Sequence, residues 1–315
     1  MPDYPFETDA NLLDRRKLLA CSAWVGTGVV WAMTAGVPQA FAMDGHGIKA
    51  PSSGFHFLQI SDTHIGFNKA ANPEPAKTLQ AAIDKVNRLE VPPALILHTG
   101  DISHLSKPAE FDLADQMLKG LPAPIRYIPG EHDVADEGAG KAYLERYGKG
   151  SKGQGWYSFD DHGVHFIALI NVMNFQPGSQ PSLGADQLMW LKDDLRAVKA
   201  STPIVVYSHV PLWTVYEPWG WGTLDGPIAL KMLASYGSVT VLNGHIHQIV
   251  QKVEGHMRFH SGRSTAYPQP VAATAPAPGP MTVPAEQLRT FLGLTTVTGH
   301  RGAHELALTD LTLAS

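Results

Sequence analysis

The chain has 315 residues and a formal net charge of -5 at pH 7, with 44% hydrophobic and 17% charged residues. These values are typical of a globular protein, and the acidic balance without a basic block argues against binding of a nucleic-acid polymer. The single cysteine, Cys21, excludes an intrachain disulfide and a cysteine-based zinc cluster. A bound metal must therefore be held by histidines and carboxylates, which suit zinc, manganese or iron.

The N-terminus has the features of an export signal. The twin arginines Arg15 and Arg16 precede a moderately apolar run over residues 18–37, and Ala40-Phe41-Ala42 has the small-residue pattern of a cleavage site. This arrangement resembles a twin-arginine translocation signal. It predicts export by the twin-arginine machinery and a periplasmic or secreted protein.

We assign the signal peptide to residues 1–42 and a linker to residues 43–54, which leaves no stable membrane span after cleavage. The alternative is an uncleaved membrane anchor, which the glycines and threonines within the apolar run disfavour.

From residue 55 onward, short apolar runs alternate with amphipathic stretches, which predicts a single α/β domain over residues 55–315. A Pro/Ala-rich segment near 267–287 indicates a long surface loop, and residues 304–314 are consistent with a last edge strand. The predicted strands are residues 55–60, 94–98, 125–128, 164–170, 203–207 and 239–242, and the predicted helices are residues 75–90, 109–121 and 184–200.

Histidines and carboxylates follow five of these strands. Ligands in open α/β sheets bind beyond the carboxyl ends of the strands, so the five clusters are expected to meet there. Any single cluster is weak evidence, but five in this order are strong. The clusters are Asp62-Thr63-His64, Gly100-Asp101, Gly130-Glu131-His132-Asp133, Ser208-His209 and Gly244-His245-Ile246-His247.

This series resembles the motifs of the calcineurin-like metallophosphoesterase superfamily over roughly residues 55–259. The spacing is most similar to the branch that contains cyclic-nucleotide and glycerophosphodiester phosphodiesterases. The resemblance implies a four-layer α/β/β/α sandwich of two mixed sheets. It also implies a centre that binds two divalent metal ions, expected to be iron, manganese or zinc.

Carried over by position, the resemblance implies a role for each motif residue. His132 would lie beside the metals as an acid catalyst or charge stabiliser, and Asp133 would orient it by accepting its ring proton. The metal ligands would be Asp62, His64 and His247 at the first ion, Glu131, His209 and His245 at the second, and Asp101 as a bridge between the two.

The chemistry fits hydrolysis of a phosphate ester. Two metals lower the pKa of bound water and neutralise the phosphoryl oxygens, so a metal-bound hydroxide can attack an anionic substrate. We therefore expect an enzyme acting on small phosphodiesters or phosphomonoesters. The resemblance to one branch of the family alone implies a weak preference for a nucleotide or glycerophosphodiester. The alternative is a noncatalytic relative that binds metal or phosphate as a sensing or structural module.

Glu131 stands where the family pattern has asparagine. As a ligand it would replace a neutral carbonyl oxygen with a charged and potentially bidentate carboxylate, which should tighten binding of the second metal. The alternative is that Glu131 turns away and water takes its place.

Four residues outside the motifs are candidates for substrate binding. Trp219 and Trp221 lie in a Gly/Pro-rich loop after His209, where aromatic side chains either line a substrate cleft or pack inward as core. Asn171 follows a predicted strand, and Arg263 could reach a substrate phosphate. His104, three residues after Asp101, could point into the cleft, but a helix-start or surface histidine is the favoured explanation.

Overall fold

The computed structural model describes residues 28–34, 37–43, 54–173, 180–299 and 305–314. The chain divides into two compact units, Met1–Ser53 and Gly54–Ser315. In the first unit, β1 (Gly28–Thr34) pairs antiparallel with β2 (Val37–Met43). Arg15 and Arg16 of the predicted signal lie outside the described residues. Among the residues described, no helix has both the length and the apolar character needed to cross a membrane.

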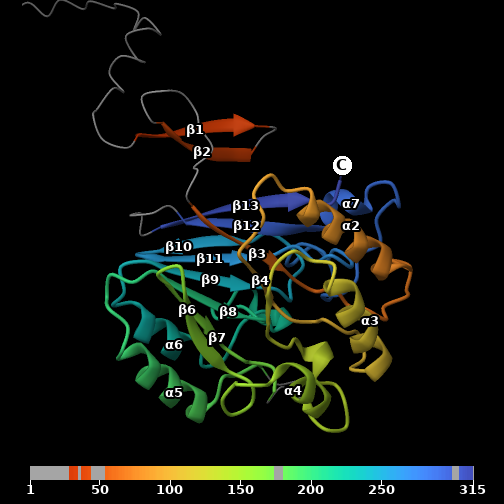
Figure 1. The fold of residues 1–315 in the computed structure, drawn as a ribbon. Coiled ribbons are helices and arrows are strands. Elements are labelled where there is room, and N and C mark those ends of the chain that lie inside the picture. The colour runs from red at the N-terminus through yellow and green to blue at the C-terminus, as the bar shows by residue number, and fades with distance from the viewer. Residues whose placement is uncertain (1–27, 35–36, 44–53, 174–179, 300–304, 315) are drawn as a thin grey trace, which may run out of the picture. The chain divides into compact units, whose positions relative to one another are not determined.

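The second unit contains two mixed sheets (Figure 1). The five-stranded sheet has the order β13-β12-β3-β4-β5, in which β3, β4 and β5 are parallel. Its strands are β3 (Phe55–Ile60), β4 (Leu95–His98), β5 (Ile125–Tyr127), β12 (Gly293–Gly299) and β13 (Leu306–Thr312).

The six-stranded sheet has the order β10-β11-β9-β8-β7-β6, in which β7, β8, β9 and β11 are parallel. Its central strands β8 and β9 are buried along their whole length, as the β-branched runs in them predict. The strands are β6 (Tyr157–Asp161), β7 (Val164–Ala168), β8 (Ile204–Ser208), β9 (Val239–Asn243), β10 (Gln251–Glu254) and β11 (Met257–Ser261).

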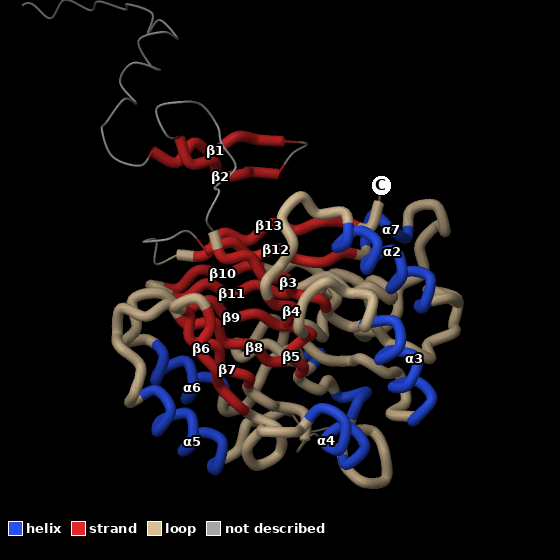
Figure 2. The backbone as a smooth tube through the Cα atoms, in the orientation of Figure 1, coloured by secondary structure: helices blue, strands red, loops and turns tan. Residues whose placement is uncertain are grey.

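Helices cover the outer face of each sheet (Figure 2). On the five-stranded sheet, α2 (Pro75–Asn87) buries Leu79, Ile83 and Val86, and Pro75 occupies its first turn, where the missing N–H costs nothing. The other helices of this sheet are α3 (Pro108–Leu118), α4 (Lys141–Tyr147) and α7 (Leu288–Phe291). The six-stranded sheet is covered by α5 (Ala185–Leu195) and α6 (Gly226–Leu233).

Three apolar clusters separate the four layers. One lies between α2, α3 and the five-stranded sheet, one between the two sheets, and one between the six-stranded sheet and α5 and α6. Phe57, Phe166 and Tyr207 belong to the middle cluster, which receives side chains from both sheets. The predicted α/β/β/α sandwich of two mixed sheets is confirmed.

The predicted strands and helices agree with the structure to within a few residues, and β13 is an edge strand as expected. Within the second unit, the sequence patterns did not predict β6, α4, α6, β10, α7 or β12. The Pro/Ala-rich segment is a loop without regular structure before α7, and most of it lies at the surface from residue 271 on. Its first residues differ from the expectation, because Tyr267 and Gln269 are buried.

Candidate metal centre

The carboxyl ends of five parallel strands place the motif residues at one edge of the sandwich. β3, β4 and β5 of one sheet carry Asp62, Asp101 and Glu131, whereas β8 and β9 of the other carry His209 and His245. The site therefore spans both sheets. The middle apolar cluster packs the two sheets together and so brings the two sets of residues to the same edge.

The backbone is strained where the ligands are expected. Among the described residues, nine that are not glycine have a positive φ, and five of these are candidate ligands. Such conformations cost of order 1–3 kcal/mol each and accumulate at functional sites. The five are Asp62 (φ 53°), His64 (φ 40°), Asp101 (φ 53°), His245 (φ 68°) and His247 (φ 53°).

Glycines allow the strand ends to approach closely. Gly100 has a φ of +95°, and a Cβ there would meet the ring of His209. A Cβ on Gly130 would overlap the carboxylate of Asp101. The glycines that precede Asp101 and Glu131 are therefore required by the geometry of the site itself.

The first group of donors consists of Asp62, His64, His247 and Asp101. His64 Nε2 lies 3.3 Å from His247 Nε2 and 3.4 Å from Asp101 Oδ2, and His247 Nε2 lies 3.2 Å from Asp62 Oδ1. The Nδ1–H of His247 donates to the carbonyl oxygen of Tyr267 at 2.6 Å, which directs its Nε2 lone pair toward the other donors.

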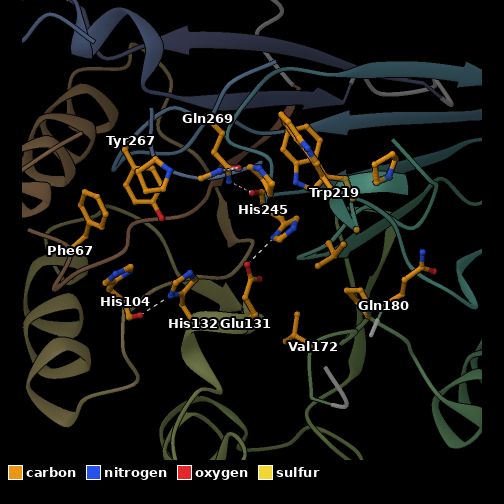
Figure 3. A pocket seen from close by; sticks show the side chains of 18 of the residues that line it. Phe67, His104, Glu131, His132, Val172, Gln180, Trp219, His245, Tyr267 and Gln269 are labelled. Carbon is orange, nitrogen blue, oxygen red and sulfur yellow. Dashed lines mark hydrogen bonds and ion pairs between the residues drawn. The ribbon is translucent and has the colours of Figure 1, made fainter. Parts of the chain in front are cut away.

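The second group consists of Glu131, His209 and His245. Glu131 Oε2 lies 2.8 Å from His209 Nε2. Glu131 Oε1 lies 2.9 Å from His245 Nδ1 (Figure 3). The Nδ1–H of His209 donates to the carbonyl oxygen of Thr99 at 2.7 Å, so its Nε2 is the ring nitrogen that faces Glu131. Glu131 therefore points toward the other two members of the group and does not turn away.

The two groups fit metal cations. Glu131 Oε2, His209 Nε2, His245 Nδ1 and Asp62 Oδ2 are buried and lack a hydrogen-bond partner within the described protein. Buried atoms that carry lone pairs are costly unless a proton or a cation satisfies them. Asp101 Oδ2 lies 3.4 Å from His64 Nε2 and 3.4 Å from His209 Nε2, so one carboxylate contacts both groups.

The electrostatics of the site also favour positive charge. Burial alone would lower the pKa of His209, but the carboxylates of Asp101 and Glu131 raise it well above its usual value. Burial would raise the pKa of Glu131, but His245 and His209 hold it well below its usual value. The Glu131 carboxylate is thus ionised, and its charge attracts a cation.

His132 lies beside both groups. Its backbone N–H donates to Asp101 Oδ1 at 2.9 Å, and its ring packs against His64 at a centroid distance of 4.8 Å. Burial lowers the pKa of His132, whereas Asp101 and Glu131 outweigh it and raise that pKa above its usual value. The ring can therefore carry a proton near neutral pH.

The expected partnership between Asp133 and the ring of His132 is not what the structure shows. Asp133 accepts hydrogen bonds from the backbone N–H groups of Ile102, Ser103 and Gly130 at 2.8–3.0 Å, so its carboxylate is turned into the protein. The short 3-10 turn Glu131–Asp133 places consecutive side chains in different directions. Asp133 holds the loop after β4 against the loop after β5.

His104 takes the place expected for Asp133. Its carbonyl oxygen accepts the Nδ1–H of His132 at 2.7 Å, and its ring stacks on that of His132 at 4.7 Å. His104 Nδ1 also lies 3.4 Å from His64 Nδ1. The expectation of a surface histidine is wrong, because the turn after Asp101 directs this ring into the cleft.

The segment after β11 also reaches the site, and the sequence analysis did not predict this. Ser264 Oγ donates to the carbonyl oxygen of Asp62 at 2.8 Å, and Gln269 Nε2 donates to that of His245 at 2.7 Å. The Tyr267 hydroxyl lies 3.1 Å from His64 Nε2. Nothing in the sequence beyond their position after the last motif marks these residues.

A cavity of about 740 Å³ opens above the donors. Trp219 lines it, and so does Trp221, although the Trp221 side chain is only 1% exposed and packs edge-on against Trp219 at 4.9 Å. The loop thus combines both alternatives left open by the sequence, with Trp219 at the cavity and Trp221 mostly as core. Phe67 and Tyr267 line the opposite side of Glu131 and His132 (Figure 3).

Two predicted substrate residues have structural partners instead. Asn171 is fully buried, and its Nδ2 donates to the carbonyl oxygen of Val210 and to Thr223 Oγ1, both at 2.8 Å. Arg263 donates to the carbonyl oxygen of Phe291 at 2.9 Å and does not line the cavity. Asn171 thereby fixes the backbone beside His209, and Arg263 anchors the turn before β12.

Comparison with known families decides the assignment of the chain. Residues 55–249 match the family model described as calcineurin-like phosphoesterase, which is most of the second unit. The chain belongs to the calcineurin-like phosphoesterase family. The matched range contains all seven candidate ligands, from Asp62 to His247.

Curated relatives support this assignment. A probable glycerophosphodiester phosphodiesterase of Arcobacter nitrofigilis is 27% identical over 209 residues, covering 61% of this chain and 71% of the relative. A probable cyclic nucleotide phosphodiesterase of Synechococcus sp. is 31% identical over 214 residues, covering 66% of this chain and 79% of the relative.

A solved structure shows the same fold. The dimetal phosphatase from Danio rerio superposes with a TM-score of 0.57 at 15% identity, covering 82% of this chain and 98% of that one. Family, relatives and donor geometry together make this chain a metallophosphoesterase, a hydrolase with clustered residues able to bind metal.

Proposed function

We propose that the protein is an exported phosphodiesterase that works with two divalent cations. The observation that carries the diester assignment is the shape of the cavity, which extends to both sides of Glu131 and His132. Phe67 and Tyr267 line one side, and Trp219 lines the other. A phosphodiester has an organic group on each side of its phosphorus, so each group would find an apolar wall. A phosphomonoester would use only one.

The relatives named as phosphodiesterases support the same choice. Two of them are named for glycerophosphodiesters and for cyclic nucleotides, both of which are small diesters. An aromatic wall such as Trp219 can stack on a base or contact an aliphatic group.

In this proposal, Asp62, His64 and His247 hold one cation, and Glu131, His209 and His245 hold the other, with Asp101 touching both. Bound cations of this kind supply an activated water and neutralise phosphoryl charge. The donor set of imidazole nitrogens and carboxylate oxygens suits manganese, iron or zinc. The alternative of a noncatalytic binding module is weakened because no candidate donor points away from its group.

The remaining groups act on the substrate or on the donors. His132 would give its proton to the leaving oxygen, with Nδ1–H fixed on the carbonyl oxygen of His104. The carbonyl oxygens of Thr99 and Tyr267 hold the rings of His209 and His247 in the orientation that leaves Nε2 for a cation.

The test compares two chromogenic esters on protein loaded with manganese, iron, cobalt or zinc. Bis(p-nitrophenyl) phosphate should be hydrolysed with a kcat/KM at least roughly tenfold above that for p-nitrophenyl phosphate. Faster hydrolysis of the monoester would contradict the diester assignment. No hydrolysis of either ester at full metal occupancy would favour the noncatalytic module.

We also propose export through the twin-arginine pathway and a periplasmic or secreted location. The support is the Arg15-Arg16 pair, the weakly apolar run and the Ala40-Phe41-Ala42 site. Replacement of both arginines by lysine should retain the full-length protein in the cytoplasm. Undiminished export of that variant would point to another route, and an unshortened exported chain would support the membrane-anchor alternative.

A further inference from the structure

The hydroxyl of Tyr267 reaches the centre of the first donor group. Tyr267 follows β11 in the chain, and its Oη lies 3.1 Å from His64 Nε2. The side chain is almost wholly enclosed, with an exposed fraction of 3%. Its ring packs on Phe67 at a centroid distance of 4.3 Å and on His247 at 4.6 Å. Packing against these two rings restricts where the hydroxyl can point.

The backbone of Tyr267 is fixed as well. Its carbonyl oxygen accepts the Nδ1–H of His247 at 2.6 Å, and its N–H donates to Ser264 Oγ at 3.2 Å. Ser264 Oγ in turn donates to the carbonyl oxygen of Asp62. The residue is thus tied to two candidate ligands of the first group, so the hydroxyl cannot leave the site without disturbing them.

The partner of this hydroxyl changes when a cation binds. His64 Nε2 also lies 3.3 Å from His247 Nε2 and 3.4 Å from Asp101 Oδ2, which makes it a donor of the first group. A nitrogen that coordinates a cation has no lone pair left to accept the hydrogen of Tyr267. A buried hydroxyl that loses its acceptor needs another, because an unsatisfied donor costs about 1–3 kcal/mol.

The cavity indicates which acceptor takes over. Tyr267 lines the cavity together with His132 and Glu131, at the place where the proposed function puts the phosphoryl group. We propose that Tyr267 is a catalytic residue whose hydroxyl donates a hydrogen bond to a non-bridging phosphoryl oxygen of the substrate. The inference rests on the proposed function for the identity of the substrate, but its geometry holds for any phosphate-like oxyanion.

The rigidity of Tyr267 suits this role. Negative charge on the phosphoryl oxygens must be stabilised throughout the reaction, and donors held in place beforehand do so without reorganisation. Ring packing and backbone hydrogen bonds hold the hydroxyl in place. Tyr267 and His132 then lie near the same phosphoryl group, the former as a donor to a non-bridging oxygen and the latter at the leaving oxygen.

The test measures binding of inorganic phosphate by calorimetry to the metal-loaded protein and to Tyr267→Phe, with metal content determined on the same samples. We expect equal metal content and a Kd for phosphate about tenfold higher in the variant, the loss typical of a hydrogen bond to a charged group. The matched control is Tyr236→Phe, which removes a hydroxyl that donates to the carbonyl oxygen of Leu195 at 2.6 Å in another part of the domain. The control should bind phosphate as the unaltered protein does.

Three results would overturn the inference. An unchanged Kd at equal metal content would show that the hydroxyl does not touch the oxyanion. Loss of metal from Tyr267→Phe would make the residue part of the metal shell. A visible charge-transfer band in the ferric protein that disappears in Tyr267→Phe would also show that Tyr267 is a ligand of the metal. Phosphate binding does not require turnover, so an inactive protein that shows the expected difference would refute the proposed function and not the role of Tyr267.

Discussion

The Glu131 carboxylate lies 2.9 Å from Nδ1 of His245, with its second oxygen 2.8 Å from Nε2 of His209. The resemblance to the family implies a neutral amide at this position, whereas this chain directs a charged carboxylate at two histidines. Glu131 Oε2, His209 Nε2 and His245 Nδ1 are all buried, and they lie so close together that one cation could take the place of the imidazole protons between them. Such an arrangement is stabilised by a cation. The departure from the pattern is best explained as a more anionic ligand set.

Glu131→Asn tests this explanation. Removing one negative charge and one donor atom from the second group should lower its affinity for a divalent cation by at least roughly tenfold, or change which metal is preferred. Metal titrations followed by calorimetry would resolve the two sites, since the first group keeps all of its donors. Glu131→Gln, which keeps the length of the side chain, is the matched control for charge. Unchanged affinity and preference in both variants would mean that Glu131 is not a ligand.

Asp133→Asn should reduce stability and not alter the pH dependence of catalysis. The Asp133 carboxylate accepts hydrogen bonds from three backbone N–H groups and from Ser103 Oγ. In the variant the amide NH₂ would face hydrogen-bond donors where a carboxylate oxygen accepts now. This clash should lower the free energy of unfolding by about 2–4 kcal/mol. Denaturant unfolding measures this, with Ser103→Ala as a milder control that removes one of the bonds. A stable variant with an altered pH–rate profile would instead restore the original expectation of a partner for His132.

Glu131 and Asp133 show how much of the site could be predicted from the sequence. The five motifs end five parallel strands, and strand ends meet by the geometry of the fold, so the positions of Asp62, Asp101 and His209 followed from the pattern. The direction of each side chain did not, because the positive φ of His64 and the 3-10 turn at Glu131–Asp133 are local backbone features. Asp133 was therefore assigned the wrong partner.

The site residues that lie outside the five motifs could not be predicted from the sequence either. Tyr267 and Gln269 begin a Pro/Ala-rich segment whose composition indicates a loop, and only the pairing of β11 beside β9 brings them to the site. The same limit applies to β12, a Thr-rich strand that inserts between β3 and β13. Long-range pairing of this kind leaves no periodic mark in the local sequence.

Trp219 and Trp221 should respond differently to truncation. Trp219→Ala should raise KM for a diester by roughly tenfold with little change in thermal stability, because its ring lines the cavity and is partly exposed. Trp221→Ala removes a buried ring and should cost about 3–5 kcal/mol in the free energy of unfolding. Steady-state kinetics and thermal unfolding on both variants check the pair. Equal losses of stability would show that the whole loop serves as core.

His165 should make stability depend on pH. Its Nδ1 lies 2.8 Å from Asp160 Oδ1 and its Nε2 lies 2.9 Å from Asp194 Oδ2, far along the chain from the donor motifs. Burial lowers the pKa of His165, but the two carboxylates outweigh burial and raise it above its usual value. The ion pairs are therefore fully present below the pKa of the unfolded chain, and their contribution is lost as the pH rises through the folded pKa.

The comparison of the protein with His165→Gln over a pH range measures this contribution. The variant should be less stable by about 1–2 kcal/mol at acidic pH, with the difference shrinking as the pH rises above neutrality. A difference in the free energy of unfolding that stays constant over the range would show that the histidine contributes through packing alone.

The central claim is that the two groups of donors hold two cations. A crystal structure of the metal-loaded protein, with anomalous scattering measured at the absorption edge of the metal, tests it most directly. The account predicts two ions about 3.5–4 Å apart, one bound by Asp62, His64 and His247 and one by Glu131, His209 and His245, with Asp101 bound to both. A single ion at full loading, or a second ion that Glu131 does not contact, would contradict it.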